Sequence, residues 1–325
     1  MRLQRAAGNE AVSLLVQREA PVDAGTKPAD AGTVTGPTAD DVTEFDLLKG
    51  TIADAAGNSL DTAAAYVAAR DKFFGSRDAY VKYKATSDAE LGGDKVLPRL
   101  IELTGDAQKV FYAWVRKAYE DQGIKDIPAL IKKGMTPELE TAIAAVEKAY
   151  GKKFAHGGFN PRPVKTGSTY KYQLGTLSPH ATGKAVDIQD STNAALENSD
   201  WAWIEKTAGK SAAGRDAATW KSDPKKAWQG IYDVNEAFVK VVAEAIKTEK
   251  ARQEKEAADA VAAKKPAPAF PAPEDVVFKG HLDLKTWSGG FFSLEWDLVK
   301  ALADQKMTWG AIWTTKVDLH HFELP

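Results

Sequence analysis

Apolar positions recur at helical spacing in two parts of the N-terminal half of the chain. Residues 2–18 carry apolar side chains every three or four positions, which predicts a short amphipathic helix able to dock on a partner. Residues 41–134 carry longer Ala-rich and apolar-periodic stretches, at 60–74 and 97–119. We therefore expect a small all-α helical domain over 41–134. Its aromatic residues are more typical of a bundle core than of a binding face.

The two helical stretches are separated by a segment with almost no apolar pattern. Residues 21–40 contain 17 Pro, Gly, Thr, Ala or Asp in 20 positions. Such a composition cannot bury enough apolar surface to offset the entropy lost when a chain becomes ordered. We predict a disordered linker over 21–40, between a docking segment at 1–20 and the helical domain.

The periodicity changes after residue 135. A helix is expected at 136–150, because Thr136 suits an N-cap and Pro137 suits the first helical turn. Residues 157–190 are rich in Gly, Pro, Thr, Tyr and Val and contain strand-like pieces such as 184–188. We therefore expect residues 135–325 to form a second domain, which contains a sheet and belongs to the α+β class.

This second domain contains an insertion at about 210–279. The insertion includes an apparent helix at 231–246, a charge-dense run at 247–265 and a Pro/Ala-rich tract at 266–273. We predict a solvated helical arm that returns through a semi-rigid, proline-rich connection. A tolerated insertion in a surface loop explains the pattern equally well.

Composition narrows the classes of function. The chain has 325 residues, with 43 Lys and Arg against 45 Asp and Glu and a formal charge of −2. This near-neutral charge gives no broad electrostatic argument for nucleic acid or an anionic membrane. The absence of cysteine excludes disulfides, thiolate metal sites and cysteine nucleophiles. No apolar run approaches the roughly 18 residues of a membrane span, and the N-terminal apolar run is too short for a Sec signal.

The scarce histidines carry the candidate chemistry. Of five in the chain, His180 lies in a predicted loop just before a predicted strand that contains Asp187. Alternation along that strand points Asp187 away from the face shared by Val186 and Ile188. A carboxylate on a buried strand needs a partner, because an isolated charge there is very costly. A divalent metal ion shared with His180 would provide one.

A second histidine near the C-terminus completes the set. If a strand begins near residue 320, His321 and Glu323 share one face, and His320 lies on the other face as a packing residue. Two histidines and one aspartate suit tetrahedral zinc, with the fourth position left for water. Asp318, three residues before His321, could then take a proton from that water as a general base.

Taken together, HxxGxAxD at 180–187 and DxxHFE at 318–323 resemble, in order and spacing, the zinc site of the D-alanyl-D-alanine carboxypeptidase-like peptidases. The DxxH form is that of the VanY-like and phage endolysin branch. The resemblance implies a compact α+β domain in which a small antiparallel sheet lines the site. It implies three zinc ligands and one catalytic base: His180, Asp187, His321 and, as the base, Asp318. It also implies hydrolysis of a peptidoglycan stem peptide, by carboxypeptidase or endopeptidase action.

The supporting residues of the family site have looser counterparts here. HGGFNPRP at 156–163 stands where the family carries a Ser-Gly-Tyr-Arg-like strand. Arg162 is the candidate for polarising the scissile carbonyl, and a simple loop arginine is the alternative. Ser178 either binds substrate or supports His180, and Glu323 is expected to be a hydrogen-bond partner of the ligands. A purely structural role is open for both.

The leading segment LQRAAGNEAVSLLVQR, at 3–18, resembles the N-terminal segments of proteins encoded with extracellular contractile injection systems. This resemblance implies a cargo or component of such a particle, attached through residues 1–20. Together with the peptidase resemblance it predicts a cell-wall-degrading effector or a wall hydrolase of the particle. Such a protein would be exported with the particle, without a Sec signal, and would act at the bacterial cell wall. An incidental amphipathic helix is the alternative for 1–20. For the whole chain, the alternative is a non-catalytic, zinc-stabilised binding or adaptor protein of such a particle.

Overall fold

The computed structural model describes residues 36–90, 106–124, 126–166 and 171–325. The chain divides into two units, of which the second, Thr38–Pro325, contains every helix and strand given below. The predicted docking segment at 1–20 lies outside the described residues, as does nearly all of the predicted linker. None of the described helices is long and apolar enough to cross a membrane.

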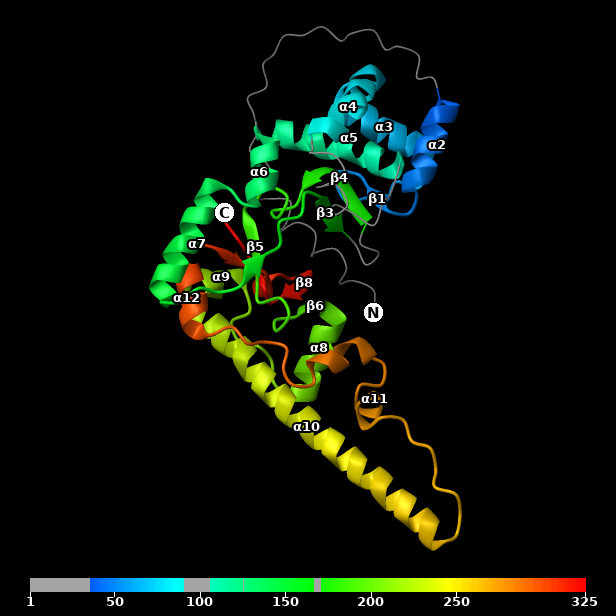
Figure 1. The fold of residues 1–325 in the computed structure, drawn as a ribbon, viewed down its shortest axis with the longest axis vertical. Coiled ribbons are helices and arrows are strands. Elements are labelled where there is room, and N and C mark those ends of the chain that lie inside the picture. Colours follow the sequence, from blue (N-terminus) through cyan, green and yellow to red (C-terminus); the bar gives the residue numbers. More distant parts are fainter. Residues whose placement is uncertain (1–35, 91–105, 125, 167–170) are drawn as a thin grey trace, which may run out of the picture. The chain divides into compact units, whose positions relative to one another are not determined.

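The first part of the second unit is a helical bundle. Its described helices are α2 (Ala39–Leu48), α3 (Ala63–Phe74), α4 (Arg77–Glu90), α5 (Asp106–Asp121) and α6 (Ile127–Lys133) (Figure 1). Thr38 begins α2 with a capping box, in which its hydroxyl accepts from the Asp41 amide while the Asp41 carboxylate accepts from the Thr38 amide. The helices pack through the periodic apolar positions that the sequence shows, and we call them the bundle.

The expectation of an all-α region was wrong in one respect. A short strand, β1 (Ile52–Ala53), lies between α2 and α3 and pairs in parallel with β4 (Lys171–Leu177). On its other side β4 pairs antiparallel with β3 (Pro163–Thr166). Both residues of β1 are fully buried. Two apolar residues thus extend a sheet whose other strands come much later in the chain, a pairing that local periodicity cannot show.

Two further sheets form the second part of the unit. The larger has the order β2-β5-β9-β7, with every neighbouring pair antiparallel. Its strands are β2 (His156–Gly157), β5 (Ala185–Ile188), β7 (Thr308–Trp309) and β9 (His321–Glu323). The smaller joins β6 (Ala195–Glu197) to β8 (Lys316–Asp318). The expectation of a mixed α+β fold with small sheets is confirmed.

The remaining helices surround these sheets. They are α7 (Pro137–Tyr150), α8 (Asn198–Ala208), α9 (Ala217–Ser222), α10 (Pro224–Ala262), α11 (Pro273–Val277) and α12 (Trp296–Asp304), with short 3-10 turns η3 (Leu282–Trp287) and η4 (Gly310–Ile312). The first of them begins as the sequence predicts, because the Thr136 hydroxyl accepts from the Leu139 amide and Pro137 opens the helix.

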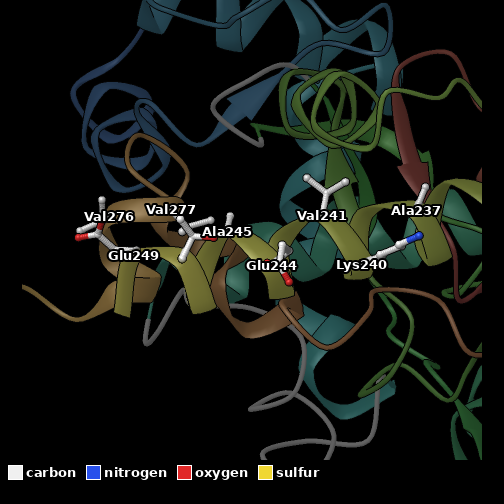
Figure 2. A pocket seen from close by; sticks show the side chains of 9 residues that line it. Ala237, Lys240, Val241, Glu244, Ala245, Glu249, Val276 and Val277 are labelled. Carbon is white, nitrogen blue, oxygen red and sulfur yellow. The ribbon is translucent and has the colours of Figure 1, made fainter. Parts of the chain in front are cut away.

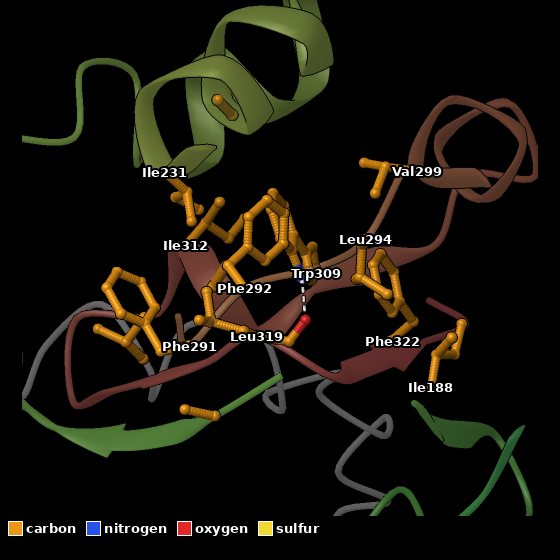
Figure 3. Packing of buried hydrophobic residues seen from close by; sticks show 14 of the residues in the cluster. Ile188, Ile231, Phe291, Phe292, Leu294, Val299, Trp309, Ile312, Leu319 and Phe322 are labelled. Atoms are coloured by element: carbon orange, nitrogen blue, oxygen red, sulfur yellow. Dashed lines mark hydrogen bonds between the residues drawn. The ribbon is translucent and has the colours of Figure 1, made fainter. Parts of the chain in front are cut away.

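Buried side chains form two separate hydrophobic clusters. The bundle cluster joins α2–α6 to β1 and β4, and it extends to Ala181 in the turn after β4. The sheet cluster joins β5, β7 and β9 to α7, α8, α10 and α12. In the sheet cluster the Trp309 indole stacks on Phe322 and donates to the Leu319 carbonyl at 2.9 Å (Figure 3). Ala181, directly after His180, thus belongs to the bundle cluster, while Val186, beside Asp187, belongs to the sheet cluster.

The insertion is more than a surface-loop excursion. Its main element, α10, is one helix of 39 residues, and its first half buries Ile231, Val234, Phe238 and Val242 in the sheet cluster. The charge-dense second half is solvated, as predicted for an arm. An apolar groove of about 720 Å³ is lined by residues of α10, among them Val241, and by Val276 and Val277 of α11 (Figure 2). The first half of α10 is therefore part of the fold that supports the site.

Candidate metal centre

Sheet register brings together the three predicted ligands. Asp187 lies on β5 and His321 is the first residue of β9, and the antiparallel pairing places these two residues directly opposite each other. Directly opposite residues of paired strands point to the same face, so their side chains meet. His180 reaches the same point from the turn between β4 and β5. The three ligand atoms all lie within 4.8 Å of one another.

The distances show which atoms converge. Nδ1 of His321 is 2.9 Å from Nε2 of His180. The Asp187 carboxylate oxygen Oδ1 is 3.3 Å from the same His180 nitrogen and 3.4 Å from Nδ1 of His321. His180 and His321 are buried, while Asp187 is partly accessible. One carboxylate oxygen therefore faces one nitrogen from each of two imidazole rings.

This close approach shifts the proton affinity of two groups. Burial alone would raise the pKa of Asp187, but the ring nitrogens of His180 and His321 outweigh it and hold that pKa well below its ordinary value. Burial alone would lower the pKa of His321, yet the Asp187 and Glu323 carboxylates raise it to about 9. The site thus combines a carboxylate that stays ionised with an imidazole, that of His321, whose positively charged form is stabilised.

The donor set fits a divalent metal ion. Two imidazole nitrogens and one carboxylate oxygen are a combination that catalytic zinc sites use. The converging Asp187 oxygen, Oδ1, is buried and receives no hydrogen bond of good geometry. Buried polar atoms are rarely left in that state. His180, Asp187 and His321 could therefore hold a metal ion.

The backbone at Gly158 closes one side of this centre. Gly158 follows β2 with a φ of 101°, which favours glycine. A Cβ atom there would lie 2.8 Å from Oδ2 of Asp187 and 2.9 Å from Nδ1 of His180. Only glycine leaves both ligands in place. Sequence reasoning missed this residue, although the paired glycines at 157 and 158 were a visible signal of close backbone approach.

Glu323 fixes the orientation of His321. Its Oε2 lies 3.1 Å from Nε2 of His321, the ring nitrogen that is not directed at Asp187. A carboxylate at this nitrogen favours the tautomer with the proton on Nε2, which leaves the lone pair of Nδ1 free for a metal ion. The Trp313 indole also packs against this imidazole, with 4.7 Å between ring centroids. Glu323 thus shares a face with His321, as alternation predicts.

Asp318 stands beside the ligands at the end of β8. Its carboxylate is buried, with Oδ2 2.6 Å from Nζ of Lys316 and Oδ1 3.1 Å from Nε2 of His320. Its negative charge helps to raise the pKa of His321, so it acts electrostatically on the ligand set. A carboxylate in this place is a candidate for proton transfer.

The expectation that His320 is a packing residue on the opposite face was wrong. Its Nδ1 lies 2.7 Å from the Asn193 carbonyl oxygen, and its Nε2 lies 3.1 Å from Asp318 and 3.8 Å from Asp187. The physical reason is the strand boundary. β9 begins at His321, so His320 belongs to the preceding turn and strand alternation does not apply to it.

Arg162 and Ser178 are joined through the backbone. Arg162 stands just before β3, and its carbonyl accepts from the Ser178 amide at 3.0 Å. Burial lowers the pKa of Arg162, and the charges of Asp187 and Asp318 oppose that change. The guanidinium itself donates to the Pro163 carbonyl at 3.2 Å. The Ser178 hydroxyl accepts from the Ala181 amide at 3.2 Å, so it supports the His180 turn.

The two remaining histidines are not members of the ligand group. His156 lies on β2, opposite Ile188, with its ring against Phe154. His281 lies 3.1 Å from the Asp200 carboxylate and stacks on Trp203. Neither carried a motif in the sequence.

Comparison of the chain with protein-family models, with curated proteins and with solved structures finds no match.

Proposed function

We propose that this chain is a zinc-dependent peptidase that cleaves peptidoglycan stem peptides. The observation that carries the proposal is the convergence of His180, Asp187 and His321 beside the buried carboxylate of Asp318. A purely structural metal site has no need of such a carboxylate. Zinc held by these three ligands would supply Lewis acidity, lowering the pKa of a water molecule to around 7 and polarising the scissile carbonyl.

Asp318 is the proton-transfer group in this proposal. Its carboxylate accepts the proton of the attacking water and returns it to the nitrogen of the leaving amine. Lys316 and His320 contact different oxygens of the carboxylate, so they restrict its rotation. Arg162 contributes positive charge near the two aspartates, where it stabilises negative charge on the carbonyl oxygen.

The substrate class follows from the family resemblance of the two patterns around the ligands. We infer an amide bond of a stem peptide, with a D-amino acid beside the cut. Removal of a terminal residue and cleavage of a cross-link both remain within this proposal, and the masses of the products distinguish them.

The test is digestion of purified peptidoglycan with and without added zinc, followed by mass analysis of the fragments. Three proteins are compared: wild type, Asp318→Asn, and Asp233→Asn as a matched control whose carboxylate pairs with Lys210 instead. We expect zinc-dependent cleavage by wild type and the control, with almost none by Asp318→Asn. Zinc binding without cleavage by any of the three would favour a zinc-stabilised binding or adaptor protein instead.

We further propose that the protein belongs to a contractile injection particle, as an effector or component attached through residues 1–20. The leading sequence 3–18 supports this attachment. The test is co-purification with assembled particles before and after deletion of residues 1–20. We expect the deletion to abolish association, and unchanged association would contradict the proposed role of the segment.

A further inference from the structure

The metal centre is assembled from two different hydrophobic clusters. Asp187 and His321 lie on β5 and β9, whose apolar residues Val186, Ile188 and Phe322 belong to the sheet cluster. His180 is followed by Ala181, which is fully buried in the bundle cluster. The geometry of the ligand set therefore depends on how the His180 turn is held against the bundle.

The bundle holds that turn with a buried hydrogen bond. The hydroxyl of Tyr119, on α5, donates to the Ala181 carbonyl at 2.7 Å. Tyr119 and Ala181 are both fully buried, so no water molecule can replace the hydroxyl as the partner of the Ala181 carbonyl oxygen. The turn also has internal bonds, since the amides of Ala181 and Thr182 both donate to the Ser178 carbonyl. Tyr119 thus fixes the peptide unit between Ala181 and Thr182, one residue after His180.

A second set of contacts holds the other end of the turn. The Thr136 amide donates to the Gly183 carbonyl at 2.9 Å. Gly183 has a φ of 67°, and a Cβ atom there would lie 2.6 Å from Cδ1 of Leu130, on α6, and 2.9 Å from Cα of Met135. The backbone of the turn is therefore pressed against the end of the bundle, and glycine is required for this approach.

We propose that the bundle is a positioning element of the metal centre, acting on His180 through Tyr119, and that metal binding and bundle stability are consequently coupled. This positioning role is separate from catalysis. It rests on the proposed function only in the premise that the site binds a metal ion. Because coupling between two parts of a molecule is reciprocal, a metal ion that binds His180 together with Asp187 and His321 also stabilises the bundle.

The first experiment uses the metal-free chain and measures hydrogen exchange at the turn amides, from Ala181 to Lys184. The variant is Tyr119→Phe, which removes one hydroxyl and keeps the ring. The matched control is Tyr66→Phe, whose hydroxyl bonds to Glu44 inside the bundle at 2.6 Å. We expect Tyr119→Phe to speed exchange of the turn amides about tenfold, the loss typical of one buried hydrogen bond. We expect Tyr66→Phe to leave them unchanged.

The second experiment measures zinc affinity of the same three proteins by calorimetry. We expect Tyr119→Phe to bind zinc about tenfold more weakly than wild type, as for loss of a residue that orients a ligand. We expect Tyr66→Phe to match wild type, and zinc to slow exchange of α5 amides in wild type. Unaltered turn exchange in Tyr119→Phe, or unaltered zinc affinity, would overturn the inference. Failure of wild type to bind zinc would refute the proposed function and the coupling, while exchange in the metal-free chain still decides the positioning role of Tyr119.

Discussion

Replacement of Gly158 by alanine is predicted to damage the metal centre more than the fold. The new methyl group would lie 2.8 Å from Oδ2 of Asp187 and 2.9 Å from the His180 ring, well inside van der Waals contact. Overpacking of this kind costs about 1–3 kcal/mol. The positive φ of 101° adds about 1–2 kcal/mol for a residue with a Cβ atom.

Of these two costs, only the steric overlap acts on the metal ligands. If Asp187 and His180 move to relieve the overlap, its free-energy cost of about 1–3 kcal/mol appears as a loss of zinc affinity of about 5-fold to 150-fold. The matched control is Gly151→Ala, because Gly151 has a φ of 80° but nothing within 4 Å of an added Cβ atom. It carries the conformational cost alone, and its zinc affinity should equal that of wild type.

The assay is calorimetric zinc titration together with urea denaturation of the metal-free proteins. We expect both glycine variants to lose stability, Gly158→Ala the more, and only Gly158→Ala to lose zinc affinity. The reasoning would be refuted if the two variants lost the same stability and kept the same affinity for zinc.

Three other residues test separate parts of the account. Arg70 forms a buried ion pair with Asp41 at 2.5 Å, so Arg70→Met should destabilise the fold by about 3–5 kcal/mol in urea denaturation. Burial alone would raise the pKa of Asp41, but Arg70 and Thr38 outweigh it and hold that pKa at about 2 against an ordinary 3.8. The stabilisation from Asp41 is therefore fully present above pH 3.8 and lost as pH falls towards 2, which acid titration of unfolding should show; Arg70→Met should reduce this loss, because only the Thr38 bonds remain. Glu323→Gln should weaken zinc binding about 10-fold to 100-fold without unfolding the chain, and unchanged affinity would contradict its orienting role. Phe238→Ala should cost about 3–5 kcal/mol, whereas a truncation of the exposed Val261 on the same helix should cost almost nothing; equal costs would contradict a core role for the first half of α10.

Local signals in the sequence predicted the elements that carry the site. The cap at Thr136 and the proline after it place the start of α7 correctly. The strand predicted over 184–188 is β5 at Ala185–Ile188, and alternation from it directs Asp187 away from the apolar face. His180, Asp187 and His321 come together as expected, because one loop and two short strands suffice to join them.

Non-local features could not be predicted from the same signals. The pairing of β1 with β4 is set by burial of Ile52 and Ala53 against residues far along the chain. The role of His320 depends on whether β9 begins at residue 320 or 321, and one position decides which way its ring points. The charge-dense half of α10 resembled a separate arm, although it continues a helix that is buried in the sheet cluster.

The most direct test of the central claim is zinc titration of activity in the metal-stripped protein, with a purified muropeptide as substrate. The account predicts no cleavage without zinc, a rise in cleavage up to one equivalent of zinc, and a plateau beyond it. Replacement of Asp187 by Asn should remove this titration while the protein remains folded. Cleavage that does not depend on zinc, or no cleavage by the fully loaded wild type, would contradict the claim.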